Sequence, residues 1–101
     1  MTIVRLLAAA DAEVSEAAAY FDDQRNGLGK RFERDLLDTL ELLREHPLAG
    51  KAVTKQSRSL RLRRFKYNIV YVLDGDEIIV VAVAHHRRRP GYWRRRLATI
   101  R

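Results

Sequence analysis

Apolar residues recur with a helical period in the first half of the chain. Thr2–Leu7, a short stretch rich in apolar residues, precedes this region and predicts a strand. Asn26-Gly27 is turn-forming, and the helical pattern ends at His46-Pro47 because the residue before a proline avoids the α region. The apolar positions on either side of the turn are Val14, Ala17, Ala18 and Phe21, then Leu28, Phe32, Leu36, Leu40 and Leu43. This half predicts one strand and an antiparallel helical hairpin.

The period changes to two after a polar loop at positions 48–56. Alternation from Leu60 to Leu73, with a bend near Lys66–Asn68, predicts two strands. A hairpin turn at Asp74-Gly75-Asp76 leads to Glu77–His85, which is apolar on both faces, as expected of a central strand. The order predicts an α+β fold, β-α-α-β-β-β: an N-terminal strand, a helical hairpin and a three-stranded antiparallel sheet, which a short C-terminal helix can follow.

Length and composition narrow the class of protein. A chain of 101 residues is the size of one domain, which we expect to span 1–101. There is no cysteine, so disulfides and thiolate metal sites are excluded. No apolar run approaches the ~20 residues of a membrane span, and the N-terminus is a poor signal peptide. We therefore expect a cytoplasmic protein that does not enter a membrane.

Charge is distributed unevenly along the chain. Positions 9–46 carry ten acids against five Lys and Arg, a balance of −5. Positions 51–101 carry fourteen Lys and Arg against three acids, a balance of +11, and Arg5 completes the net +7. This asymmetry predicts an anionic partner, either nucleic acid or an acidic protein segment. The acidic helix face is interpreted as solvated surface.

The basic segment HHRRRPGYWRRRL, positions 85–97, is where chemistry could lie. A shared metal is disfavoured because His85 and His86 are adjacent on a strand and point to opposite faces, while His46 suits a helix C-terminus. No metal and no cofactor are expected. RNA cleavage without a metal needs a base, a cation for the phosphorane and an acid, which His85 or His86, Arg64, the Arg87–Arg89 run and Tyr92 could supply. These residue types are common in any basic protein.

Trp93 has two interpretations. It could stack on a nucleic-acid base, as aromatics among arginines do in RNA-binding proteins. We favour packing of the tail onto the domain, because Trp93 is the only tryptophan and Leu97 follows one helical turn later.

Three motifs in this order resemble the RelE/ParE toxin superfamily of bacterial toxin–antitoxin systems. They are HP-x-x-G at positions 46–50, R-R-F-x-Y-x-I-x-Y at 63–71, and H-x-R-R followed by P-x-Y-W at 85–93. The resemblance covers nearly the whole chain. GLGKRF at the start of the second helix and the long hairpin are more similar to ParE-like members.

The resemblance implies a small basic toxin held in a hetero-oligomer by an antitoxin. Such antitoxins usually pair a ribbon-helix-helix DNA-binding region with an acidic C-terminal segment that wraps the toxin. ParE-like members inhibit DNA gyrase without being known as nucleases, whereas RelE-like members cut mRNA on the ribosome. RelE-like sites commonly include a further Lys or Glu set on the middle strands. Here those strands carry Arg61, Arg63, Arg64 and Lys66, with no carboxylate before Asp74.

We therefore expect a gyrase-directed toxin. The alternatives are a ribosome-dependent, metal-independent endoribonuclease and a non-toxic basic module that binds nucleic acid. The catalytic candidates for the nuclease are Arg64, His85, Arg88 and Tyr92. The residues expected to contribute to partner binding are Arg61, Arg63, Arg64, Arg87, Arg88, Arg89 and Trp93, with Trp93 pinning the tail.

Overall fold

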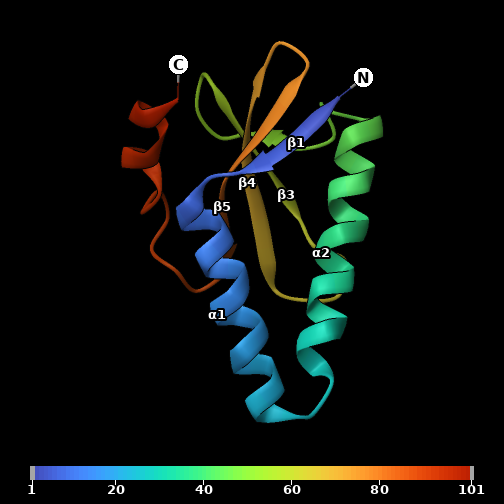
Figure 1. Cartoon of the computed structure of the whole chain (residues 1–101). Helices are drawn as coiled ribbons and strands as arrows, with labels where there is room; N and C mark the ends of the chain where they lie inside the picture. Colours follow the sequence, from blue (N-terminus) through green and yellow to red (C-terminus); the bar gives the residue numbers. More distant parts are fainter. Residues whose placement is uncertain (1, 101) are drawn as a thin grey trace.

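The computed structural model describes residues 2–100, in which two long helices pack on one face of a five-stranded sheet (Figure 1). The elements in chain order are β1 (Ile3–Leu6), α1 (Ala8–Gln24), α2 (Leu28–Glu45), β2 (Lys51–Ala52), β3 (Ser57–Arg61), β4 (Tyr67–Asp74), β5 (Glu77–His85) and the 3-10 helix η1 (Arg94–Thr99). The α+β class, the helical hairpin and the short C-terminal helix are confirmed. Within residues 2–100, no helix is long and apolar enough to cross a membrane.

The prediction of a three-stranded sheet is wrong, because the strand order is β1-β5-β4-β3-β2. β1 pairs in parallel with β5, with Val4 opposite Ile78, and periodicity says nothing about a partner so distant in the chain. β2 lies within the expected loop at 48–56 and is too short to show a period. The break between β3 and β4 falls at positions 62–66, slightly before the predicted bend. β5 is paired on both sides, by β1 and β4, as predicted for an interior strand.

The turn and the close helix contact explain the glycines of the hairpin. Gly27 has a φ of 88°, a left-handed conformation that favours glycine. Gly29 lies against the backbone of Ala18, where a side chain would collide with the carbonyl oxygen. The Asp22 carboxylate accepts a hydrogen bond of 2.8 Å from the Gly29 amide. Glycine at position 29 therefore lets α1 and α2 approach closely.

The HP-x-x-G motif meets β4 at the buried hydroxyl of Tyr71. This hydroxyl donates to the Pro47 carbonyl at 2.7 Å and accepts from the Gly50 amide at 2.9 Å. A Cβ atom at Gly50 would lie 2.6 Å from the same oxygen. Burial raises the pKa of Tyr71, despite the hydrogen bond from Gly50 and the nearby Arg58. Two motifs that are separate in the sequence thus form one contact, which fixes the loop after α2.

Each face of the sheet has its own apolar cluster. The helix side holds Phe32, Leu43, Ile69 and Val80 among others. On the other side, Val70, Val72, Val81, Ala82 and Trp93 form a second cluster, to which Leu7, Tyr92, Leu97 and Ile100 add partly buried contacts. Strand alternation gives the two faces, and a register shift lets the adjacent Val81 and Ala82 join the same cluster, since Val70 pairs with Ala82 but Tyr71 pairs with Val80, so Val81 is an extra residue on β5. The C-terminal segment therefore closes part of the sheet face that the helices leave open.

Candidate functional site

The site begins where β5 extends beyond its neighbour β1. The pairing ends at Leu6 and Val80, so the backbone of β5 from Val81 onward has no strand partner on that side. Two side chains take its place: Glu13 accepts a hydrogen bond of 3.0 Å from the Val83 amide, and Arg96 donates one of 3.0 Å to the Val81 carbonyl. Buried backbone polar groups are thereby satisfied without a further strand.

Glu13, Tyr92 and Arg96 form a network that we call the tail clamp. The two terminal guanidinium nitrogens of Arg96, Nη1 and Nη2, each donate to the Glu13 carboxylate at 3.0 Å, and the Tyr92 hydroxyl donates to it at 2.6 Å. The side chains are 11% exposed for Glu13 and 23% for Arg96. A two-pronged contact of this kind is among the stronger polar interactions in proteins. The tail clamp joins α1, β5 and the C-terminal segment.

The pKa values within the tail clamp follow from these contacts. Burial, the largest influence, raises the pKa of Glu13, but the hydrogen bonds from Arg96, Tyr92 and Val83 together outweigh it and leave the pKa below its ordinary value. Burial, followed by the Glu13 carboxylate, raises the pKa of Tyr92 well above its usual range. The hydrogen bond to Glu13 is the main cause of the raised pKa of Arg96. All three groups therefore keep their usual protonation states near neutral pH.

A cleft of about 230 Å³ lies between strands β3 to β5 and the segment that follows β5. We call it the sheet cleft; it is lined by Val53, Ser59, Asn68, Val70, Ala84, His85, His86 and residues 88–93. His86 contacts the Asn68 side chain at 3.1 Å, whereas the His85 ring meets the edge of Tyr67, 5.1 Å between ring centres. The two histidines thus make their contacts on opposite faces, as strand alternation predicts. Burial, then the charges of Arg61 and His85, lowers the pKa of His86.

The structure brings together three of the four residues considered for catalysis. His85, Arg88 and Tyr92 line the sheet cleft, and the Arg88 guanidinium lies 3.8 Å from the centre of the Tyr92 ring. Arg64 lines a different groove, beside the start of α2. The Tyr92 hydroxyl is already bound to Glu13. The four catalytic candidates therefore do not lie in one site. Tyr92, the candidate general acid, already donates its proton in a structural hydrogen bond.

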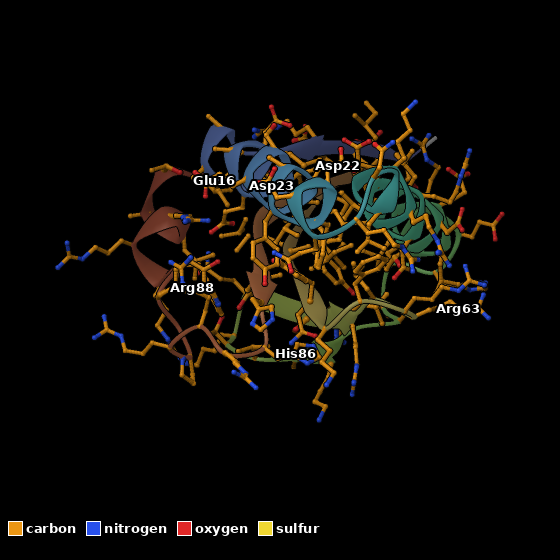
Figure 2. All side chains as sticks on the ribbon, turned by 90° about the horizontal axis from the view of Figure 1, so that it is seen from below. Glu16, Asp22, Asp23, Arg63, His86 and Arg88 are labelled. Atoms are coloured by element: carbon orange, nitrogen blue, oxygen red, sulfur yellow. The ribbon has the colours of Figure 1, made fainter. Side chains whose placement is uncertain are left out.

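The residues expected to meet a partner are spread over several surfaces. Arg61 lines a shallow hollow of about 620 Å³ that borders the sheet cleft at Asn68 and His86, and Arg63 lies near the acidic C-terminal part of α2. Arg88 and Arg89 line the sheet cleft. Figure 2 shows Arg63 and Arg88 at opposite ends of the molecule, with His86 between them on the side away from Glu16 and Asp23 of α1. Arg61, Arg63, Arg64, Arg87, Arg88 and Arg89 are all exposed. Trp93 is only 5% exposed and packs in the second apolar cluster.

Sequence reasoning missed the structural roles of two acids, the partly buried Glu13 and the buried Asp35. Asp35 is 2% exposed and accepts hydrogen bonds from the amides of Arg64 and Phe65 at 2.8 and 3.0 Å. A signal was present in each case. Glu13 is four positions before the buried Ala17, and Asp35 lies between the buried Phe32 and Thr39 at helical spacing. A carboxylate that lies within an apolar stripe of a helix needs a hydrogen-bond donor from another element, because an unpaired buried charge is costly.

These features define a small α+β protein with a clamped C-terminal segment and, within residues 2–100, many arginines outside salt bridges. Comparison with known proteins identifies its family. The family model described as the ParE toxin of the type II toxin-antitoxin system, parDE, matches residues 4–90. The chain belongs to this family, and the resemblance inferred from the motifs is confirmed.

The fold is also similar to that of a solved structure. It is titled "Chromosomal ParDE TA system from P. aeruginosa" and aligns with a TM-score of 0.74 at 15% identity, covering 84% of this chain and 96% of the other. At this identity the likeness concerns the fold alone. A search of curated proteins found no match.

Proposed function

We propose that this chain is the toxin of a type II toxin–antitoxin pair, that an antitoxin with an acidic C-terminal segment neutralises it in a hetero-oligomer, and that its cellular target is DNA gyrase. The observation that carries the proposal is a set of exposed arginines without acidic partners on a chain of the ParE toxin family. Within residues 2–100, the arginines in salt bridges are Arg5, Arg44 and Arg96, none of which belongs to the set expected to bind a partner.

An acidic antitoxin segment would match both the exposed apolar side chains of the helices and the positive charge of the arginines. Three large apolar side chains are exposed there: Tyr20 at 57%, Leu37 at 55% and Leu42 at 42%. A segment that folds upon binding must offset its ordering entropy by burying apolar groups and pairing charges. The helices offer the apolar part, and the arginines of β3 and of the segment after β5 offer the charge. Trp93 contributes by holding that segment in place from within the core.

The state of the candidate catalytic groups supports gyrase inhibition over RNA cleavage. A general acid must give up its proton in the transition state, and the raised pKa of Tyr92 and its bond to Glu13 oppose this. Arg64, the cation considered for the phosphorane charge, lines a separate groove. We therefore propose a toxin that acts by binding its target.

Neutralisation is tested by complex formation with the protein encoded next to this chain. The two proteins should co-purify at low and moderate salt, and the complex should weaken as salt rises because charge pairing is screened. The same neighbour should restore growth when both genes are expressed. No association at low salt would contradict the antitoxin assignment.

The target is tested by inducing the gene in a bacterium and following DNA supercoiling, DNA breaks and mRNA integrity together. Gyrase inhibition predicts DNA breaks, an SOS response and filamentous cells, with mRNA intact. Arg88→Ala serves as the diagnostic variant, since a nuclease would lose its cleavage when this cleft residue is removed. Cleaved mRNA in the wild type, lost in Arg88→Ala, would establish the RelE-like alternative instead.

A further inference from the structure

A groove of about 550 Å³ at the closed end of the helical hairpin gathers positive charge. We call it the tip groove; it is lined by Arg25, Leu28, Lys30, Arg31, Arg34, Arg64 and Phe65. Five of these seven residues are cations and none is an acid. Four of the five lie in the half of the sequence whose overall balance is negative, so the local excess is visible only in the fold.

The walls of the tip groove are held by acids that are engaged with backbone amides. Asp35 accepts from the amides of Arg64 and Phe65, which fixes the loop between β3 and β4 against α2. Asp22 accepts from the Gly29 amide at the start of α2. The Phe65 ring packs against Phe21 and Phe32, with ring centres 4.8 and 5.4 Å apart. The backbone around the groove is therefore fixed by the fold. The two nearby carboxylates, Asp22 and Asp35, accept hydrogen bonds from that backbone.

The cations of the tip groove have no partner within the described chain. The three salt bridges within residues 2–100 include none of the five, and all five side chains are exposed. Five like charges around one groove repel one another, so an anion that binds several of them at once gains from each. Four of the five are arginines, whose planar guanidinium matches the oxygens of a phosphate.

We propose that the tip groove binds the phosphate backbone of double-stranded DNA. A duplex presents about one negative charge per 1.7 Å of its axis, and its recognition by such a groove needs no apolar pocket. An acidic peptide is a poorer fit, because a segment that folds on binding needs apolar contacts. The large exposed apolar side chains lie elsewhere, and Leu28 and Phe65 are only partly exposed.

Single-stranded nucleic acid is also a poorer fit than a duplex. Proteins that bind single strands usually stack the bases on exposed aromatic rings. Phe65 is the only aromatic residue lining the tip groove, and its ring is engaged with Phe21 and Phe32. This inference does not depend on the toxin assignment, since it concerns binding by the isolated chain.

The test measures binding of a short fluorescent DNA duplex to the purified chain by anisotropy at several salt concentrations. Arg31→Gln/Arg34→Gln removes two charges from the tip groove, and Lys55→Gln/Arg95→Gln removes two exposed charges that line neither the tip groove nor the sheet cleft. We expect the tip variant to bind about tenfold more weakly at moderate salt, with a salt slope smaller by roughly 2. The control variant should stay within about twofold of the wild type.

Several outcomes would overturn the proposal. Equal weakening in both variants would assign binding to net charge, and unchanged binding in the tip variant would remove the groove from it. Tighter binding of a single-stranded RNA of equal length, or loss of poly-glutamate binding without loss of duplex binding, would assign another ligand. Circular dichroism checks that each variant is folded, and Arg25→Gln/Lys30→Gln replaces the tip variant if it is not.

Discussion

The chain contains the run Arg-Arg-Arg twice within ten residues, and the fold uses the two runs differently. Arg87, Arg88 and Arg89 are all exposed and have no acidic partner in the described chain. In the second run, Arg94–Arg96, the last arginine turns inward and is held by Glu13 of α1. The two runs have the same three residues but different neighbours, and only the second brings an arginine within reach of the acid on α1. The first run is exposed throughout, whereas in the second run Arg96 secures the tail and Arg94 and Arg95 remain exposed.

The largest expected effect is the loss of the inward arginine. Arg96→Ala removes both hydrogen bonds from the guanidinium to the mostly buried Glu13 carboxylate and frees the Val81 carbonyl, so we expect the free energy of unfolding to fall by about 3 kcal/mol. Arg87→Ala, the matched exposed change, should alter it by less than about 0.5 kcal/mol. Urea denaturation followed by circular dichroism measures both. Equal unfolding free energies for Arg96→Ala and Arg87→Ala would contradict the proposed difference between the two arginine runs.

Removal of the Tyr92 hydroxyl should have a smaller effect. Tyr92→Phe deletes one hydrogen bond to the Glu13 carboxylate but leaves Arg96 and the Val83 amide in place, so we expect a loss of about 1.5 kcal/mol. The same urea titration checks this. Unchanged stability in Tyr92→Phe would contradict the structural role of this hydroxyl.

Lowering the pH should modestly reduce the stability that the tail clamp contributes. The pKa of Glu13 is lowered in the folded chain from a usual value of 4.5, so the stability it contributes is present above about pH 4.5 and is lost as the pH falls through the lower folded value. Glu13→Gln carries no such titration and should show a flatter decline below pH 4.5. Unfolding free energies at a series of pH values from 7 to 3 make the comparison. Parallel curves for the two proteins would show that Glu13 carries no such contribution.

The sequence predicted most elements but few of the contacts between distant ones. The helical stripe of α2 and the alternation of β4 are local patterns, and both appear where expected. The parallel pairing of β1 with β5 and the extra residue Val81 depend on distant partners, and no period reports them.

The candidate site was predictable in its residue types and not in its grouping. The exposed arginines and the buried Trp93 follow from composition and spacing. The tail clamp was missed because the donors that meet Glu13 lie about 70 to 80 positions further along the chain, and the tip groove because Arg31 and Arg34 lie in a half with negative net charge. Charge summed along the chain hides charge that the fold gathers in space.

The central claim is that the first arginine run faces the antitoxin. It is tested most directly by calorimetric titration of the neighbouring gene's protein into the wild type, into Arg87→Gln/Arg88→Gln/Arg89→Gln, and into the matched variant Lys55→Gln/Arg94→Gln/Arg95→Gln. We predict at least a tenfold loss of affinity, about 1.4 kcal/mol, for the first variant, and a change below about threefold for the matched variant. Equal losses, or no loss in the first variant, would contradict the account.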